Sequence, residues 1–144
     1  MKRKKFIKTC GIGCLSLVSG ASLLAGCVGT RHISVPISDS FLIIPVSEFA
    51  NEKKGGYRKY LIVQNEELSY PICVYRLSKN EYTAIWMRCT HQGTELQAYG
   101  DRLQCPAHGS EFSNTGALQN GPADQPLRTF PTTTDLNQIK IDLR

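Results

Sequence analysis

Two short segments of this 144-residue chain each carry one cysteine and one histidine. The first holds Cys89 and His91, the second holds Cys105 and His108, and 13 residues separate His91 from Cys105. Thiolates and imidazoles are good ligands for transition metals, so a chain that uses all four must bring two loops together at one site. The usual zinc spacing pairs cysteine with cysteine and histidine with histidine, whereas here each segment supplies one of each. This pattern favours a binuclear centre in which one iron binds both cysteines and the other binds both histidines.

The residues around the two pairs extend the pattern. They are Gly93 after the first pair, Gly109, Ser110, Phe112 and Gly116 after the second, and the later run Gly121-Pro122-Ala123. With these motifs the chain resembles the Rieske family over residues 41–144. The resemblance implies one [2Fe-2S] cluster per chain. Cys89 and Cys105 would bind the inner iron, and His91 and His108 would bind the outer, solvent-facing iron.

The resemblance also assigns four residues to the surroundings of the cluster: Gly93, Ser110, Phe112 and Pro122. Ser110 matches a serine whose hydroxyl points at a bridging sulfide in high-potential members of the family. Phe112 replaces a tyrosine that donates to a cysteine sulfur in those members, and phenylalanine cannot donate. Thr94 and Ala107 stand where quinol-oxidising members carry two further cysteines that form a disulfide. We therefore expect an intermediate potential, below that of the disulfide-bearing proteins.

Short runs of aromatic and β-branched residues, separated by turn clusters, predict strands. The runs are 41–46, 57–63, 72–77, 82–87, 97–99 with Leu103, and 139–143. No window keeps a helical period over three turns. The expected fold is therefore all-β, an antiparallel sandwich or barrel, and the resemblance adds a small cluster-binding subdomain of loops.

The N-terminal region predicts export and attachment to a membrane. A basic start followed by an uncharged stretch is typical of a signal peptide, here residues 1–26. The run Leu24-Ala25-Gly26-Cys27 resembles a bacterial lipobox, which implies lipidation of Cys27. An uncleaved transmembrane anchor over residues 9–30 is the alternative. Residues 2–8 resemble a twin-arginine signal with one arginine replaced by Lys4, and a plain basic leader explains them equally well.

The domain that follows is predicted to be neutral, with a linker at 27–40 and the Rieske domain at 41–144. Five of the 17 Lys and Arg residues precede Cys27, which leaves 12 against 12 Asp and Glu. We therefore expect no nucleic-acid partner. Cys73 is expected to be a buried core thiol and His32 an exposed side chain. Tyr82 and Trp86 are expected to be core aromatics.

These features predict a lipid-anchored electron carrier of the cell envelope, facing the periplasm or exterior. It would take single electrons from quinol or a redox protein and pass them on. One alternative is a subunit of a larger oxidoreductase, similar to quinol–cytochrome c reductase or to the small subunit of arsenite oxidase. A zinc-stapled binding module is another. The sequence leaves open whether the chain is an enzyme, but three histidines cannot supply both the cluster and a mononuclear iron triad.

Overall fold

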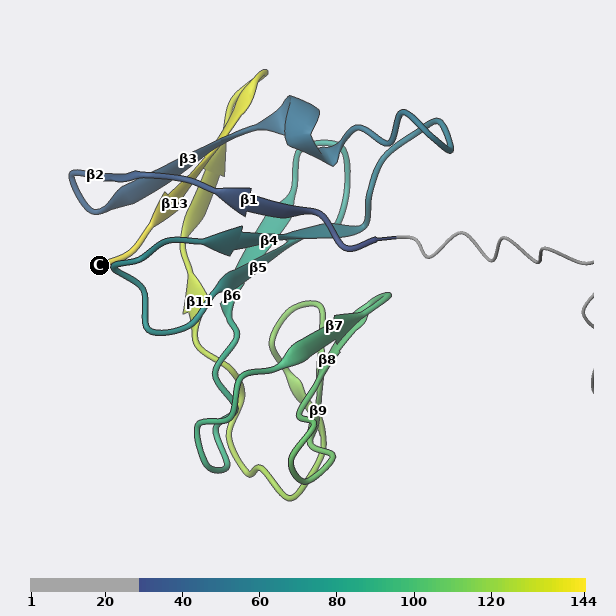
Figure 1. Ribbon diagram of the computed structural model, residues 1–144, viewed down its shortest axis with the longest axis vertical. Coiled ribbons are helices and arrows are strands. Elements are labelled where there is room, and N and C mark those ends of the chain that lie inside the picture. The colour runs from purple at the N-terminus through teal and green to yellow at the C-terminus, as the bar shows by residue number, and fades with distance from the viewer. Residues whose placement is uncertain (1–28) are drawn as a thin grey trace, which may run out of the picture.

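The computed structural model describes residues 29–144, which form three β-sheets with almost no helix (Figure 1). The predicted signal peptide at 1–26 and the predicted lipid site at Cys27 lie outside the described residues. In the part of the chain that is described, no helix is long and apolar enough to cross a membrane. The all-β fold class predicted from the sequence is confirmed.

The central sheet has five strands in the order β1-β4-β5-β6-β11. They are β1 (His32–Ser34), β4 (Tyr60–Gln64), β5 (Ile72–Arg76), β6 (Tyr82–Trp86) and β11 (Thr129–Phe130). β1 runs parallel to β4, and the other neighbours are antiparallel. Because side chains alternate along a strand, β5 serves two cores: Ile72 and Val74 face one, while Cys73 and Tyr75 face the other.

A second sheet covers the first face of the central sheet, in the order β12-β13-β3-β2. Its strands are β2 (Ile37–Ser38), β3 (Phe41–Pro45), β12 (Thr132–Thr134) and β13 (Gln138–Asp142). Leu42 and Ile44 of β3 and Ile139 and Ile141 of β13 are completely buried against the central sheet. The short 3₁₀ helix η1 (Val46–Phe49) adds Phe49 to this core. The two sheets and the core between them form the sandwich that the strand pattern predicted.

The third sheet forms the small subdomain in the lower half of Figure 1, in the order β10-β9-β8-β7. Its strands are β7 (Gln97–Tyr99), β8 (Arg102–Gln104), β9 (Glu111–Ser113) and β10 (Leu118–Asn120). Leu96, Leu103 and Phe112 are buried with Ile85 and Met87 in the second core. The two predicted ligand segments are therefore connected to strands that pack in the second core.

The structure corrects the prediction that residues 27–40 act as a linker. Residues 32–34 and 37–38 are strands of the two large sheets, so the fold begins before residue 41. The physical reason is a period-2 apolar pattern: Val35 is buried, and Ile33 and Ile37 pack against the first core. His32 is exposed, as expected, although it lies within β1.

The other single-residue predictions are mostly confirmed. Cys73 is completely buried, and burial raises the pKa of its thiol. Tyr82 is a core residue whose ring lies 5.1 Å from that of Phe49. Trp86 is only half-buried and lies edge-on to the ring of Tyr70, so it borders the core instead of filling it.

Candidate metal centre

The first predicted ligand loop is a tight hairpin closed by backbone hydrogen bonds. Arg88 pairs with Glu95 at its base. The Cys89 N–H donates to the Thr94 carbonyl at 2.9 Å, and the Gly93 N–H donates back to the Cys89 carbonyl at 2.9 Å. Gly93 has a φ of +75°, a conformation that glycine adopts without strain. The loop thus holds its cysteine and histidine on a fixed backbone.

The second loop repeats this geometry at the same positions. Gln104 pairs with Glu111 at its base. The Cys105 N–H donates to the Ser110 carbonyl at 2.8 Å, and the Gly109 N–H donates to the Cys105 carbonyl at 3.0 Å. Gly109 has a φ of +80°. In both loops a glycine four residues after the cysteine makes the turn, so the structure presents two equivalent cysteines and two histidines.

The two cysteines form a buried pair at the inside of the site. Cys89 and Cys105 are 1% and 2% exposed, and neither forms a disulfide. Burial, together with the neighbouring Cys105 thiol, raises the pKa of Cys89. Burial also opposes ionisation of Cys105, but the backbone N–H groups of Ala107 and His108 outweigh it and lower the pKa of Cys105. These N–H groups stabilise a thiolate, the form in which cysteine binds iron.

The two histidines form a second pair at the outside of the site. Their ring centroids are 5.1 Å apart and the rings are nearly perpendicular. The His91 Nδ1 atom is buried and has no hydrogen-bond partner among the described residues, whereas His108 is exposed. A buried imidazole nitrogen without a partner is unfavourable unless it binds something else, and metal ligation would satisfy it. The residues present therefore fit a [2Fe-2S] cluster held by two cysteines and two histidines. In residues 29–144, no three Cys, His, Asp or Glu side chains gather around a single point.

A third loop closes the site and contacts both ligand loops. Ser110 is completely buried, and its Oγ accepts a hydrogen bond from the Ala123 N–H at 3.0 Å. The Thr90 hydroxyl donates to the Gln125 carbonyl at 2.8 Å. Pro122 is exposed beside Ala123, so it shapes the loop from outside. Because Ser110 Oγ accepts from Ala123, its own proton remains available for an acceptor on the other side.

The base of the site is anchored to the central sheet by side chains that the sequence did not single out. The Tyr70 hydroxyl donates to the Gly93 carbonyl at 2.6 Å, which fixes the first loop. The Tyr75 hydroxyl donates to the Arg102 carbonyl at 2.9 Å, which fixes β8 beneath the second loop. These partners are 23 and 27 residues apart, and no local pattern in the sequence predicts such contacts.

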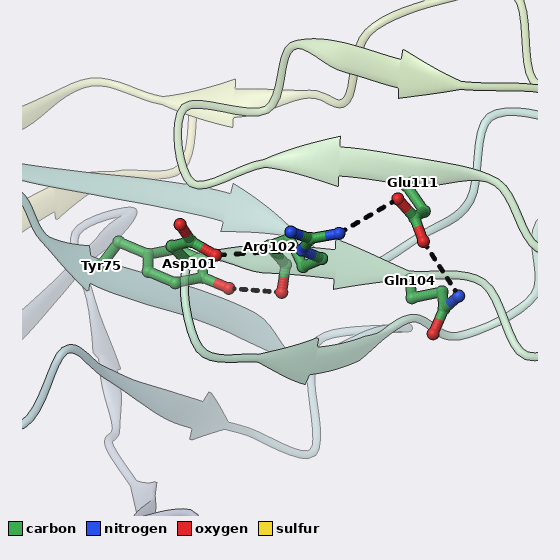
Figure 2. Close-up of polar contacts among 5 residues, drawn as sticks. All are labelled: Tyr75, Asp101, Arg102, Gln104 and Glu111. Atoms are coloured by element: carbon green, nitrogen blue, oxygen red, sulfur yellow. Dashed lines mark hydrogen bonds and ion pairs between the residues drawn. The ribbon is translucent and has the colours of Figure 1, made fainter.

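Glu111 joins two strands next to the second loop, as Figure 2 shows. Its carboxylate accepts from Gln104 at 3.2 Å and lies 3.4 Å from the Arg102 guanidinium, which also faces Asp101 at 3.8 Å. Such partly exposed ion pairs contribute little each, so we assign them a role in alignment. Phe112 follows Glu111 and is completely buried, so it supports the site through packing.

We expect Ser110→Ala to weaken the fold of the site. The change leaves the Ala123 N–H without its partner, which costs about 1–3 kcal/mol for a buried group. Thermal denaturation of the cluster-bearing protein should show this loss. Ser113→Ala is the matched control, since Ser113 lies in β9 next to the same hairpin and bonds only to the local turn. An equal loss in both variants would contradict a special role for Ser110.

Comparison with known proteins identifies the family. The Rieske [2Fe-2S] domain matches residues 41–131, which is well over half of the chain, and the chain therefore belongs to the Rieske [2Fe-2S] domain family. Members of this family bind a [2Fe-2S] cluster, so the cofactor predicted from the sequence is confirmed.

Several relatives are iron-sulfur subunits of cytochrome b6-f complexes, and another is a demethylase. The chain is 25% identical over 99 residues to the cytochrome b6-f complex iron-sulfur subunit of Gloeobacter violaceus, covering 67% of this chain and 47% of that protein. It is 36% identical over 66 residues to the methylxanthine N1-demethylase NdmA of Pseudomonas putida, covering 44% of this chain and 17% of that protein. The chain thus spans less than half the length of these two relatives.

Among solved structures, the plasma membrane Rieske protein PetC3 of Synechocystis PCC 6803 superposes with a TM-score of 0.51. The identity is 28%, and the match covers 58% of this chain and 85% of PetC3. A chain from the carbazole 1,9a-dioxygenase complex of oxygenase and ferredoxin has a TM-score of 0.55 at 21% identity, covering 74% and 95%. This second likeness shows the fold alone.

Proposed function

We propose that the chain is a one-electron carrier tethered to a membrane outside the cytoplasm, with Cys89, Cys105, His91 and His108 as the cluster ligands. The observation that carries the proposal is the convergence of a buried cysteine pair and a facing histidine pair on two equivalent hairpins. When bound, a Rieske cluster supplies reversible one-electron chemistry. The protein's part is to hold this group rigidly and to expose one edge of it.

The asymmetry of the site supports an electron port at the histidines. The cysteines are almost completely buried, while His108 is exposed at the tip of the second loop. An electron partner that docks at this tip approaches the imidazole edge before any other ligand. The Ser110 hydroxyl and the backbone N–H groups at Cys105 would favour the more negative, reduced form. Phe112 offers no donor, which supports the intermediate potential expected from the sequence.

The proposal is tested on purified residues 29–144, which contain every strand described and both cores. We expect a red-brown protein with two irons and two acid-labile sulfides per chain. After reduction, its electron paramagnetic resonance spectrum should be that of mixed histidine and cysteine ligation. A colourless protein that binds zinc stoichiometrically after attempted reconstitution would contradict the proposal and favour the zinc-stapled module.

A subunit role in a larger oxidoreductase is the second candidate. The likeness to cytochrome b6-f iron-sulfur subunits favours it. The absence of cysteine at Thr94 and Ala107 weighs against a quinol-oxidising subunit of the disulfide-bearing type. Purification of the intact protein from its membrane, followed by identification of associated chains, distinguishes a stable subunit from a separate carrier. Quinol, or a redox protein, remains the proposed donor in either case.

Replacement of the predicted lipid site tests the tether. We expect Cys27→Ala to abolish acylation and to release or misprocess the protein, because a lipid chain contributes its membrane affinity through each buried methylene. Fractionation of cells that produce either form measures the effect. Ser22→Ala is a suitable control in the same segment. If the Cys27→Ala protein remains in the membrane with an uncut N-terminus, the transmembrane anchor is the correct interpretation.

A further inference from the structure

One end of the central sheet carries an unusual concentration of positive charge. The two segments that meet there, residues 52–59 and 76–81, hold six of the 12 Lys and Arg residues found after Cys27 but only two of the 12 acidic residues. We call these two segments the basic end. The remainder of the domain after Cys27 is correspondingly acidic, with ten acidic residues against six basic ones. The domain after Cys27 therefore has no net charge, but its positive and negative side chains are concentrated in different regions.

The strand pairing brings the two segments together. Tyr60 at the start of β4 pairs with Tyr75 near the end of β5, and the Arg76 N–H donates to the Lys59 carbonyl at 2.8 Å. A hollow of about 330 Å³ lies between the segments, and its charged lining residues are Arg58, Lys59, Arg76 and Lys79. The positive side chains thus surround one surface feature.

Two of these arginines, Arg58 and Arg76, are partly buried in the wall of the hollow. The Nε atoms of Arg58 and Arg76 are buried and have no hydrogen-bond partner among the described residues. The Arg76 guanidinium also lies over the ring of Tyr57, 3.6 Å from its centroid, and Tyr57 is 59% exposed. Guanidinium groups bind phosphate oxygens well, and tyrosine is enriched at the interface between membrane and water. The chemistry of this surface fits phosphate groups beside a hydrocarbon layer.

The basic end is also where the described chain begins. Because β1 is parallel to β4, their starts lie at the same end of the sheet, on the right of Figure 1. The Thr30 hydroxyl lies 3.3 Å from the Tyr60 hydroxyl, next to Lys59. Only four residues separate Cys27 from His32, and five steps of extended chain reach about 17 Å. A lipid on Cys27 would therefore hold the basic end close to the membrane surface.

The cluster loops lie at the opposite end of the same sheet. β6 runs from Tyr82, which pairs with Arg76, toward Cys89. Six residues of nearly extended chain lie between Tyr82 and Cys89, so the seven steps span about 23 Å. The loops after β6 lie at the bottom of Figure 1. An acidic redox partner bound at the basic end would lie too far from the histidines to exchange electrons with them efficiently. This distance favours the membrane as the occupant of the basic end.

We propose that the basic end is a docking surface for anionic phospholipid headgroups, which holds the domain against the membrane with the cluster loops facing away from it. The proposal deepens the proposed function, because it assumes a tether at Cys27 to set the distance. It also predicts that the tether and the headgroups act together. The histidine edge would then be presented to a soluble partner, which favours a redox protein over quinol as the electron donor.

The test uses cluster-bearing residues 29–144, without a tether, and vesicles of phosphatidylcholine with or without phosphatidylglycerol. Each basic residue near an anionic surface strengthens binding about five-fold, so Lys59→Gln with Lys79→Gln should bind the anionic vesicles about 25-fold more weakly. Lys140→Gln with Arg144→Gln removes the same charge from the second sheet and the C-terminus and is the matched control. We expect this control to bind like the unmodified domain, and we expect binding to fall as salt is raised.

Three results would overturn the proposal: no binding to anionic vesicles at low salt, equal loss in both double variants, or equal binding to neutral vesicles. Binding of an acidic redox protein that only the Lys59 and Lys79 changes weaken, without vesicle binding, would assign the surface to a protein partner instead. The electron paramagnetic resonance spectrum is recorded on the same samples. A normal spectrum with no vesicle binding rejects the docking surface alone, whereas an absent cluster rejects the electron carrier.

Discussion

Cys105→Ser is expected to abolish cluster binding almost completely. Cys105 is 2% exposed and lies beside Cys89, and backbone N–H groups of its own loop already stabilise its thiolate. Serine has the same shape, but its hydroxyl stays protonated at neutral pH and is a poor ligand for iron. The inner iron would keep only Cys89 of its two protein ligands. Iron and acid-labile sulfide should therefore fall from two of each per chain to nearly none.

Cys73→Ala is the control for this variant. Cys73 is equally buried and belongs to the same core, but it lies on β5 beneath the site and not on a ligand loop. Removing its sulfur costs packing, about 1 kcal/mol for a small buried group, and should leave the iron and sulfide content unchanged. If Cys105→Ser kept a full complement of iron and sulfide, Cys105 would not be a ligand. If Cys73→Ala lost the cluster as well, the effect would be one of folding.

The two segments with a cysteine and a histidine stand out in the sequence because their pattern is local. A cysteine, a histidine and a glycine within five residues make a recognisable motif, and each hairpin is closed by backbone hydrogen bonds within the loop itself. The central strands are predictable for a similar reason, since short runs of β-branched residues are typical of buried strands. β5 and β6 lie within one residue of the predicted runs.

The short strands and the supporting contacts could not be predicted in this way. β9, β10, β11 and β12 have two or three residues each, which is too short for a period to stand out. The bonds from Tyr70 to Gly93 and from Ser110 to Ala123 join residues that only the folded topology brings together. β1 and β2 were hidden for a different reason: Pro36 and the polar neighbours of Ile33 and Val35 resembled a linker, although the alternation was present.

His108→Cys is expected to keep part of the cluster and to lower its reduction potential. Two ferric ions, two sulfides and two thiolates have no net charge, and neutral imidazoles leave that sum unchanged. A third thiolate makes the oxidised centre negative, so adding an electron becomes less favourable. Rieske centres lie at roughly −150 to +300 mV and all-cysteine plant-type centres near −400 mV, so one exchange should lower the potential by on the order of 100 mV or more.

Protein film voltammetry of the variant and the unmodified protein measures this shift. His32→Cys is the control, because it adds the same thiol to an exposed position in β1, outside the two ligand loops. Its potential should not change. An unchanged potential in His108→Cys, with normal iron content, would remove His108 from the ligand set and with it the exposed electron port. A lowered potential would place a ligand at the more exposed imidazole of the pair, since His108 is exposed and His91 is only partly exposed. Electrons would then enter and leave through the tip of the second loop.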